Sequence, residues 1–136
     1  MNDSDQEADI GWSIDLAEGW EGHDDGDTSI FTTPDGVGVL QITAFEGDQD
    51  ITEQDLATLA GDIPKDSVRE GFSNAHFKGF SIASQIDGEY RHAWYLGGKH
   101  LAVAVSYICN EEDRSEEMDL VRAMVKSLEL IQGTSE

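Results

Sequence analysis

The chain has 136 residues, of which 38% are hydrophobic, with three Trp, three Tyr and five Phe. This is enough apolar material for the core of one ordinary domain, and it excludes global disorder. The formal net charge is −21, from 29 acidic and 8 basic residues, and a field of this sign disfavours binding to nucleic acid or to anionic membranes.

The acidic charge is concentrated in the first half of the chain. Residues 1–64 contain 17 acids and neither Lys nor Arg, whereas residues 65–136 contain 12 acids and all 8 basic residues. Such an asymmetry speeds encounter with a basic protein partner. A surface that serves only solubility, or adaptation to a salty cytoplasm, explains the same asymmetry, and both interpretations stay open.

The sequence carries no sign of a membrane or secreted protein. No apolar run approaches the roughly 20 residues that a membrane helix needs. The opening residues MNDSDQEADI are acidic, where a signal peptide is basic and then apolar. We therefore expect a cytoplasmic location. Cys109 is the only cysteine, so no internal disulfide can form, and its place at the end of an apolar strand favours a buried side chain.

The first half of the chain predicts an acidic tail at 1–9 and then three strands, over residues 10–16, 28–33 and 37–45. The stretch 19–27 is rich in glycine and acid, which is typical of an exposed loop. A helix follows, because Thr52 and Asp55 have the spacing of a capping box. Its apolar residues Leu56, Leu59, Ala60 and Ile63 have helical spacing.

The second half predicts three more strands and a second helix. Residues 65–76 fit either another helical turn or a loop, and a strand over 77–86 turns at Asp87-Gly88 into the next one. Residues 89–109 predict two strands joined by Gly97-Gly98, apolar on both faces and therefore central in a sheet. That turn pairs these residues: Trp94 with Leu101, His92 with Val103, and Tyr90 with Val105.

The last predicted element is a helix with Ser115 as its cap and Glu116 and Glu117 in its first turn. Its apolar stripe comprises Met118, Leu120, Val121, Met124, Val125 and Leu128. The predicted fold class is α+β: an antiparallel sheet of about six strands flanked by helices, in the order βββ-α-βββ-α. We expect a single domain over 10–131 and a tail over 132–136.

The order of several segments resembles a known fold group. The segments are GWSIDLAEGWE, PDGVGVLQIT, ITEQDL, FKGF, WYLGGKHLAVAVSYICN and VRAMVKSLEL. The chain resembles the PsbP-like group, which includes the PsbP accessory protein of photosystem II, the Ran-binding nuclear import factor and small uncharacterised bacterial proteins. The resemblance spans roughly residues 10–130 and is clearest from Trp94 to Asn110. It implies a six-stranded antiparallel sheet between helices, no established catalytic site, and a role in binding other proteins. By analogy with small acidic bacterial proteins of this kind, it also suggests an immunity partner of a secreted toxin.

Motifs of catalysis and of cofactor binding are absent from the sequence. There is no GxSxG, no GxxxxGK[ST] and no GxGxxG. His92 and His100 fall on opposite faces of the predicted hairpin, so they do not share a zinc ion. The acidic stretch 21–27 lacks the bidentate Glu of a calcium loop. We therefore predict no enzyme, no cofactor and no metal.

Two candidate sites follow from the pattern. In the first, Trp20 stands beside Glu21, Asp24, Asp25 and Asp27, an arrangement that suits a basic and partly apolar protein partner. The alternative is that Trp20 packs over the end of the sheet.

The second candidate is a pocket between sheet and helix, where Tyr90, His92 and Tyr107 would serve a small ligand or a reaction. The alternative for His92 is a hydrogen-bonded histidine of the core. The edge strands of such a sheet also permit a weak dimer, so we expect a monomer or a weak dimer.

Overall fold

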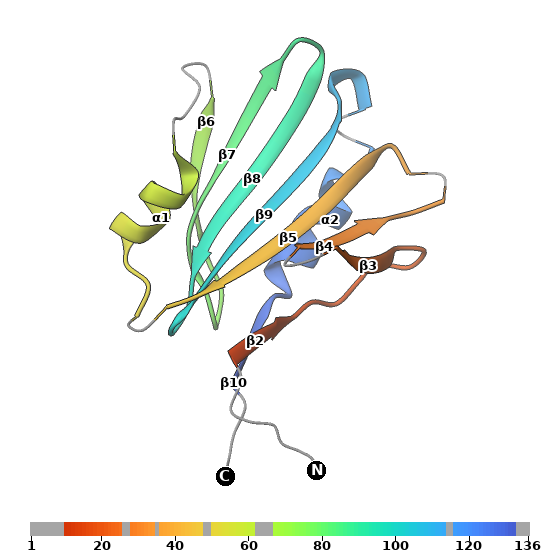
Figure 1. The fold of residues 1–136 in the computed structure, drawn as a ribbon. Helices are drawn as coiled ribbons and strands as arrows, with labels where there is room; N and C mark the ends of the chain where they lie inside the picture. Colours follow the sequence, from red (N-terminus) through yellow and green to blue (C-terminus); the bar gives the residue numbers. More distant parts are fainter. Residues whose placement is uncertain are drawn as a thin grey trace.

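The computed structural model describes residues 10–25, 28–34, 36–47, 50–61, 67–113 and 116–132. Its main feature is a seven-stranded antiparallel sheet with the strand order β3-β4-β5-β9-β8-β7-β6 (Figure 1). The strands are β3 Glu21–Asp25, β4 Thr28–Thr32, β5 Gly38–Glu46, β6 Val68–Ser73, β7 Lys78–Ile86, β8 Glu89–Gly97 and β9 Leu101–Asn110. The helices are α1 Glu53–Ala60, the 3₁₀ turn η1 Glu111–Asp113, and α2 Met118–Lys126. The predicted α+β class and antiparallel sheet are confirmed, with one strand more than expected.

The two ends of the described chain form a separate two-stranded sheet. Here β2 (Ile10–Ser13) pairs antiparallel with β10 (Glu129–Gln132). The predicted strand over 10–16 is therefore shorter than expected and lies outside the main sheet. Strand β10 was not predicted, because four residues are too few to show a period, and it includes Gln132, which the pattern assigns to a tail.

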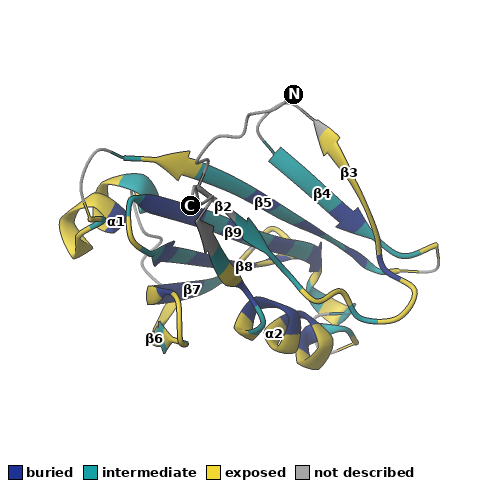
Figure 2. Cartoon of the chain, turned by 90° about the horizontal axis from the view of Figure 1, so that it is seen from below, coloured by how far each residue is buried: buried dark blue, intermediate teal, exposed yellow. Residues whose placement is uncertain are grey.

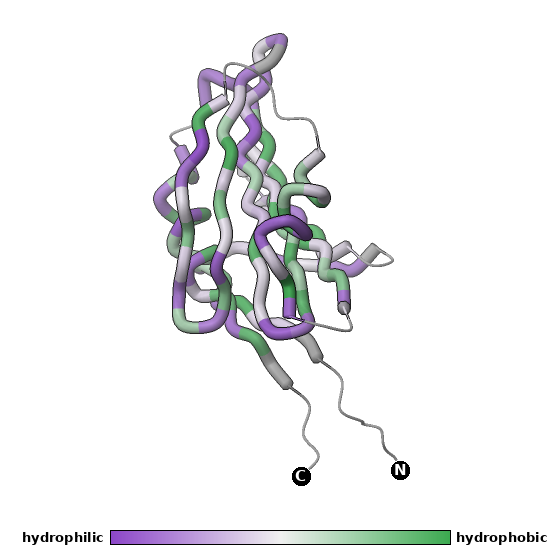
Figure 3. The backbone as a smooth tube through the Cα atoms, turned by 90° about the vertical axis from the view of Figure 1, so that its left-hand side faces the viewer, coloured by the Kyte–Doolittle hydropathy of each residue, from purple (hydrophilic) through white to green (hydrophobic). Residues whose placement is uncertain are grey.

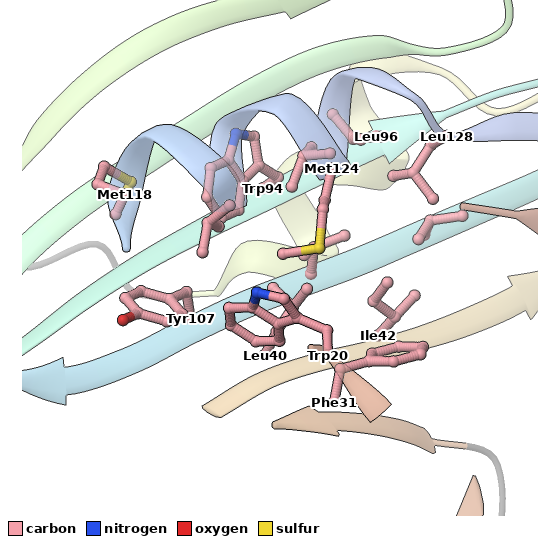
Figure 4. Packing of buried hydrophobic residues seen from close by; sticks show 14 of the residues in the cluster. Trp20, Phe31, Leu40, Ile42, Trp94, Leu96, Tyr107, Met118, Met124 and Leu128 are labelled. Atoms are coloured by element: carbon pink, nitrogen blue, oxygen red, sulfur yellow. The ribbon is translucent and has the colours of Figure 1, made fainter. Parts of the chain in front are cut away.

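The two faces of the main sheet are covered by different helices. Along each strand, alternate side chains point to opposite faces, and the hydropathy of the chain alternates accordingly (Figure 3). Helix α2 lies against one face with its outer side exposed (Figure 2). The residues between α2 and this face form the larger core, which includes Trp20, Leu40, Ile42, Trp94, Val103, Tyr107, Val121, Met124 and Val125 (Figure 4). On the other face, α1 contributes Leu56 to a smaller cluster with Phe80, Ile82 and Ala102.

Both edges of the sheet are strands that the sequence pattern did not reveal. Strand β3 lies within the stretch 19–27, expected as a loop, and β6 lies within 65–76, expected as a helical turn or a loop. Most side chains of both strands are exposed. An edge strand with little burial needs no alternation of apolar residues, and charges protect it from pairing with other chains. Those two expectations were wrong for this reason.

The central hairpin has the predicted faces but a different turn. Strands β8 and β9 pair Trp94 with Val105, His92 with Tyr107 and Tyr90 with Cys109, which is four residues away from the predicted register. The turn is centred on Lys99-His100, since the Gly98 amide donates to the Leu101 carbonyl (2.7 Å) and His100 has a φ of 66°. A shift of four residues is even, so each side chain keeps its face.

The helices begin as capping chemistry directs, with one exception. At α1 both hydrogen bonds of the predicted capping box are present: the Asp55 amide donates to Thr52 Oγ1 (3.1 Å) and the Thr52 amide donates to Asp55 Oδ2 (3.0 Å). The α2 helix begins later than predicted, with Glu117 at its N-cap position and no side-chain cap bond. The predicted cap, Ser115, lies outside the described residues.

The predicted stripe of α2 is buried apart from Leu120, which is 47% exposed. No helix among the described residues is long and apolar enough to cross a membrane.

Candidate ligand-binding site

The first candidate surface is divided by the fold. A turn from Ala17 to Trp20, with Gly19 at a φ of 90°, directs Trp20 into the core, where its side chain is only 6% exposed. The Trp20 side chain is therefore part of the larger core and not of the exposed surface. Glu21 and Asp24 remain exposed on β3.

The structure describes only part of the acidic cluster that the sequence predicts around Trp20. Asp24 accepts a hydrogen bond from the Ser29 hydroxyl (2.9 Å) across the β3–β4 pair. The side chain of Asp25 is not among those described, and Asp27 lies outside the described residues.

The second candidate site centres on His92. The alternation of β8 places Tyr90, His92 and Trp94 on the face that α2 covers. His92 is 2% exposed, its ring stacks on the Trp94 ring at 4.1 Å between centroids, and its Nδ1 lies 3.1 Å from the Tyr90 hydroxyl. Its Nε2 is buried and has no hydrogen-bond partner among the described residues. A buried polar atom without a partner costs roughly 1–3 kcal/mol, so it requires an explanation.

Burial also sets the charge of this imidazole. Desolvation lowers the pKa of His92 from 6.5 to about 4, and the positive charge of Arg122 acts in the same direction. His92 is therefore neutral at pH 7, with one ring nitrogen a donor and the other an acceptor. If the Tyr90 hydroxyl donates to Nδ1, then Nε2 carries the hydrogen and is a donor.

A hollow of about 570 Å³ lies beside His92, between α2 and strands β6 to β8. This volume is within the range of small-molecule sites. The lining residues are Val68, Glu70, Ala83, Ser84, Gln85, Tyr90, His92 and Arg122. The hollow is therefore lined by His92, whose Nε2 lacks a partner among the described residues, together with a guanidinium and a carboxylate.

A second hollow, of about 460 Å³, adjoins the first and shares Glu70 and Arg122 with it. Its walls are more apolar, because Trp94, Phe72 and Ala123 contribute to them. Where the two hollows meet, Arg122 on α2 and Glu70 on β6 form an ion pair with a separation of 3.8 Å. Both side chains are about half exposed, at 50% and 56%, so this pair is weak.

Tyr107, the third residue of the predicted pocket, does not line either hollow. It is fully buried on β9, opposite His92, and its hydroxyl donates to Glu117 Oε1 (2.7 Å) at the start of α2. Burial raises the pKa of Tyr107, and Glu117 raises it further. Its role is to hold the beginning of α2 on the sheet, so the fold brings Tyr90 and His92 together with Arg122 and leaves Tyr107 apart.

The sequence analysis missed Glu70 and Arg122. Glu70 belongs to β6, which carries no apolar alternation, and Arg122 lies on the polar side of α2, where a charged residue normally faces solvent. A pattern within one element does not reveal that two charges from different elements meet. Among the described residues, no three His, Cys, Asp or Glu side chains gather as a metal site requires.

Comparisons with known proteins agree on the fold and go no further. No family model matches the chain, and no curated protein matches it. A protein from Bacteroides thetaiotaomicron superposes with a TM-score of 0.63 at 18% identity, over 92% of this chain and 46% of the other. LpqN of Mycobacterium tuberculosis, described as involved in cell envelope biogenesis, superposes with a TM-score of 0.56 at 9% identity, over 90% of this chain and 84% of the other.

The chain thus spans less than half the length of the Bacteroides protein. The neighbours also include PsbP of the cyanobacterium Synechocystis, at 13% identity and a TM-score of 0.45, over 96% of this chain and 98% of the other. The superpositions on the Bacteroides protein and on LpqN show that the chain shares a fold with other bacterial proteins, as its sequence predicts. At these identities the likeness concerns the fold alone, because one fold hosts many functions.

Proposed function

We propose that this protein is a binding domain that takes a small ligand in the hollow between α2 and strands β6 to β8. The observation that carries this proposal is His92, which lines the hollow and whose buried Nε2 lacks a hydrogen-bond partner among the described residues. A ligand that hydrogen-bonds to Nε2 would remove the cost of leaving this atom unsatisfied. Binding would then stabilise the fold, since a ligand that binds only the native state raises its stability.

The proposed role is binding without catalysis. A histidine with a pKa of about 4 is a weak base at neutral pH, far from the value that suits proton transfer there. The missing motifs of nucleophilic and phosphate chemistry point the same way. The ligand would be held by Nε2 and by the charged groups at the rim.

A fragment screen tests this function. Isotope-labelled protein would be titrated with a mixed library of neutral, cationic and anionic fragments, and amide and indole signals would be followed by NMR. We expect hits that shift the indole signal of Trp94 and are lost in the His92→Phe variant, which keeps a ring on Trp94 but has no Nε2. Fragments that shift only residues far from the hollow, or no hits at all, would refute the proposal.

A second function is favoured by the exposed acids Glu21 and Asp24 on the edge strand β3. A basic protein could add a strand to this edge, with main-chain hydrogen bonds for affinity and the acids for attraction. If that basic partner were a secreted toxin, this protein would act as its immunity-type inhibitor. This proposal concerns the opposite edge of the sheet from the hollow.

Pull-down of a cell lysate at low and moderate salt tests the second function. The variant Glu21→Lys/Asp24→Lys should lose one dominant basic protein, whereas Glu112→Lys/Glu116→Lys, which changes the net charge equally at exposed positions elsewhere, should retain it. Equal retention by both variants would show that β3 is not the binding surface.

A further inference from the structure

The two adjoining hollows differ in chemistry, and the difference indicates the kind of ligand. One is lined by His92 and by polar residues such as Ser84 and Gln85, and the other by Trp94, Phe72 and Ala123 beside the charged Asp119 and Lys126. Arg122 borders both. A ligand that spans them needs a polar head at Arg122 and a flat apolar body beside the aromatic rings.

The charge at the junction selects the sign of the head. Arg122 acts on His92 as a positive charge. With the Tyr90 hydroxyl as the donor to Nδ1, the neutral imidazole carries its hydrogen on Nε2 and offers a second donor. A guanidinium has five N–H donors in a plane that suits a carboxylate. The Glu70 carboxylate already forms an ion pair with the Arg122 guanidinium, so a carboxylate fits beside this guanidinium.

The ion pair with Glu70 is too weak to exclude a ligand. Charge-assisted hydrogen bonds usually measure 2.7–2.9 Å, whereas Arg122 Nη1 and Glu70 Oε1 are 3.8 Å apart. An exposed pair of this kind contributes about 0–1 kcal/mol, so a ligand carboxylate with a second donor at His92 competes with it readily. Glu70 would then act as a displaceable occupant of the anion position.

We infer that the hollow binds a small organic carboxylate with a flat apolar body, its head between Arg122 and His92 Nε2 and its body against Trp94 and Phe72. This inference rests on the proposed function and deepens it by naming the ligand class. In a chain with a net charge of −21, such a site has to create its own local positive potential. Arg122 and Lys126, one turn later, are the positive charges that line the two hollows, and the acids Glu70 and Asp119 line them as well, so the head has to lie at the Arg122 guanidinium itself.

The test compares acids with their uncharged amides. Phenylacetate, 3-phenylpropionate and indole-3-acetate would each be titrated beside the corresponding primary amide, with the Nε2 shift of His92 and the indole signal of Trp94 as readouts. We expect each acid to bind at least tenfold more tightly than its amide. The Nε2 signal should move on binding, which a purely structural histidine would not show.

Four variants locate the interaction. Arg122→Gln and His92→Gln should each weaken acid binding at least tenfold. Arg122→Gln should leave the binding of the amides little changed. Glu70→Gln should strengthen acid binding several-fold, because the competing carboxylate is removed. The control is Arg91→Gln, which also removes one positive charge, from an exposed residue next to His92 on β8 whose side chain points to the other face. It should bind the acids as the parent does.

The outcomes separate this inference from the proposed function. If acids and amides bind the hollow equally well, or if neutral or cationic fragments are the ones that bind in a His92-dependent way, the hollow is a ligand site but the carboxylate inference is wrong. If acid binding survives Arg122→Gln unchanged, the inference is also wrong. If no probe and no fragment moves Trp94 or His92, the inference and the proposed function fail together.

Discussion

The two sides of α2 meet the sheet in different ways. Toward β9 and β5 the contact is closed, and the side chains of Leu40, Ile42, Val103 and Val125 are completely buried (Figure 4). Toward β8, β7 and β6 it is open, with two hollows and a loose ion pair. The open side also holds His92 Nε2. Packing is complete on the closed side and incomplete on the open side, and the proposed ligand site rests on this contrast.

The largest expected loss of stability comes from a substitution in the closed contact between α2 and the sheet. Met124 is 2% exposed, and Met124→Ala should lower the free energy of unfolding by about 3 to 4 kcal/mol through lost burial and a cavity. The matched control is Leu120→Ala on the same helix, where the side chain is 47% exposed and the loss should stay below about 1 kcal/mol. Urea denaturation measures both, and similar losses in the two variants would contradict the closed packing.

The next largest effect is the pH dependence of stability that His92 on the open side produces. The pKa of His92 is lowered from 6.5 to about 4 in the folded state, so the unfolded chain binds a proton between these values that the folded chain does not. Stability from this group is therefore complete above pH 6.5 and is lost as the pH falls toward 4, by about 2 to 3 kcal/mol.

Because many carboxylates titrate in the same range, the measurement is a difference between variants. Urea denaturation from pH 7.5 to 4 should give a smaller loss in His92→Gln than in the parent. His23→Gln replaces an exposed histidine on β3 and keeps His92, so it should retain the steeper loss. Parallel curves for the parent and His92→Gln would show that His92 is not buried as described.

The same contrast explains how much the sequence predicted. Strands with a buried face have a recognisable pattern of apolar residues. The sequence therefore predicted β4, β5, β7, β8 and β9, and it placed Trp94 and Tyr95 on opposite faces of the sheet. The hairpin turn was not, because Gly97-Gly98 has the residues of a two-residue turn while the chain turns two residues later, at Lys99-His100. The edge strands β3 and β6 show no alternation because little of them is buried.

For the candidate site, the local pattern placed Tyr90 and His92 on one face of the hairpin but did not reveal the residues of other elements beside them. Glu70 and Arg122 come together only when β6 forms and α2 lies beside it, and Tyr107 is held apart by its hydrogen bond to Glu117. Trp20 was placed among acids by the sequence and in the core by a turn at Gly19. These are consequences of tertiary structure, which no spacing within one segment encodes.

A third effect concerns the width of the open side. Asn74, between β6 and β7, donates from Nδ2 to the carbonyls of Lys126 (3.1 Å) and Leu128 (3.0 Å) at the end of α2. Its Oδ1 accepts from the amides of His76 (2.8 Å) and Phe77 (2.7 Å). Asn74→Ala should therefore cost about 2 kcal/mol and loosen α2 from the β6–β7 end of the sheet.

Hydrogen exchange resolves this prediction by residue. The amides of His76 and Phe77 should exchange faster in Asn74→Ala, and fragment binding in the hollow should weaken because its walls separate. The neighbouring exposed Ser73, changed to Ala, serves as control and should alter stability by less than about 0.5 kcal/mol. Unchanged exchange at both amides would exclude Asn74 as the connection between the sheet and α2.

The smallest effect compares one polar pair from each side of α2. On the closed side Tyr107 donates to Glu117 at 2.7 Å, and a double-mutant cycle of Tyr107→Phe and Glu117→Gln should give a coupling of about 2 kcal/mol. On the open side Glu70→Gln and Arg122→Gln should give about 0.5 kcal/mol or less at low salt, and nothing measurable in about 1 M NaCl, because both side chains are half exposed. A coupling on the open side as large as that on the closed side would mean that Glu70 holds Arg122 firmly, and a ligand carboxylate would then not displace it.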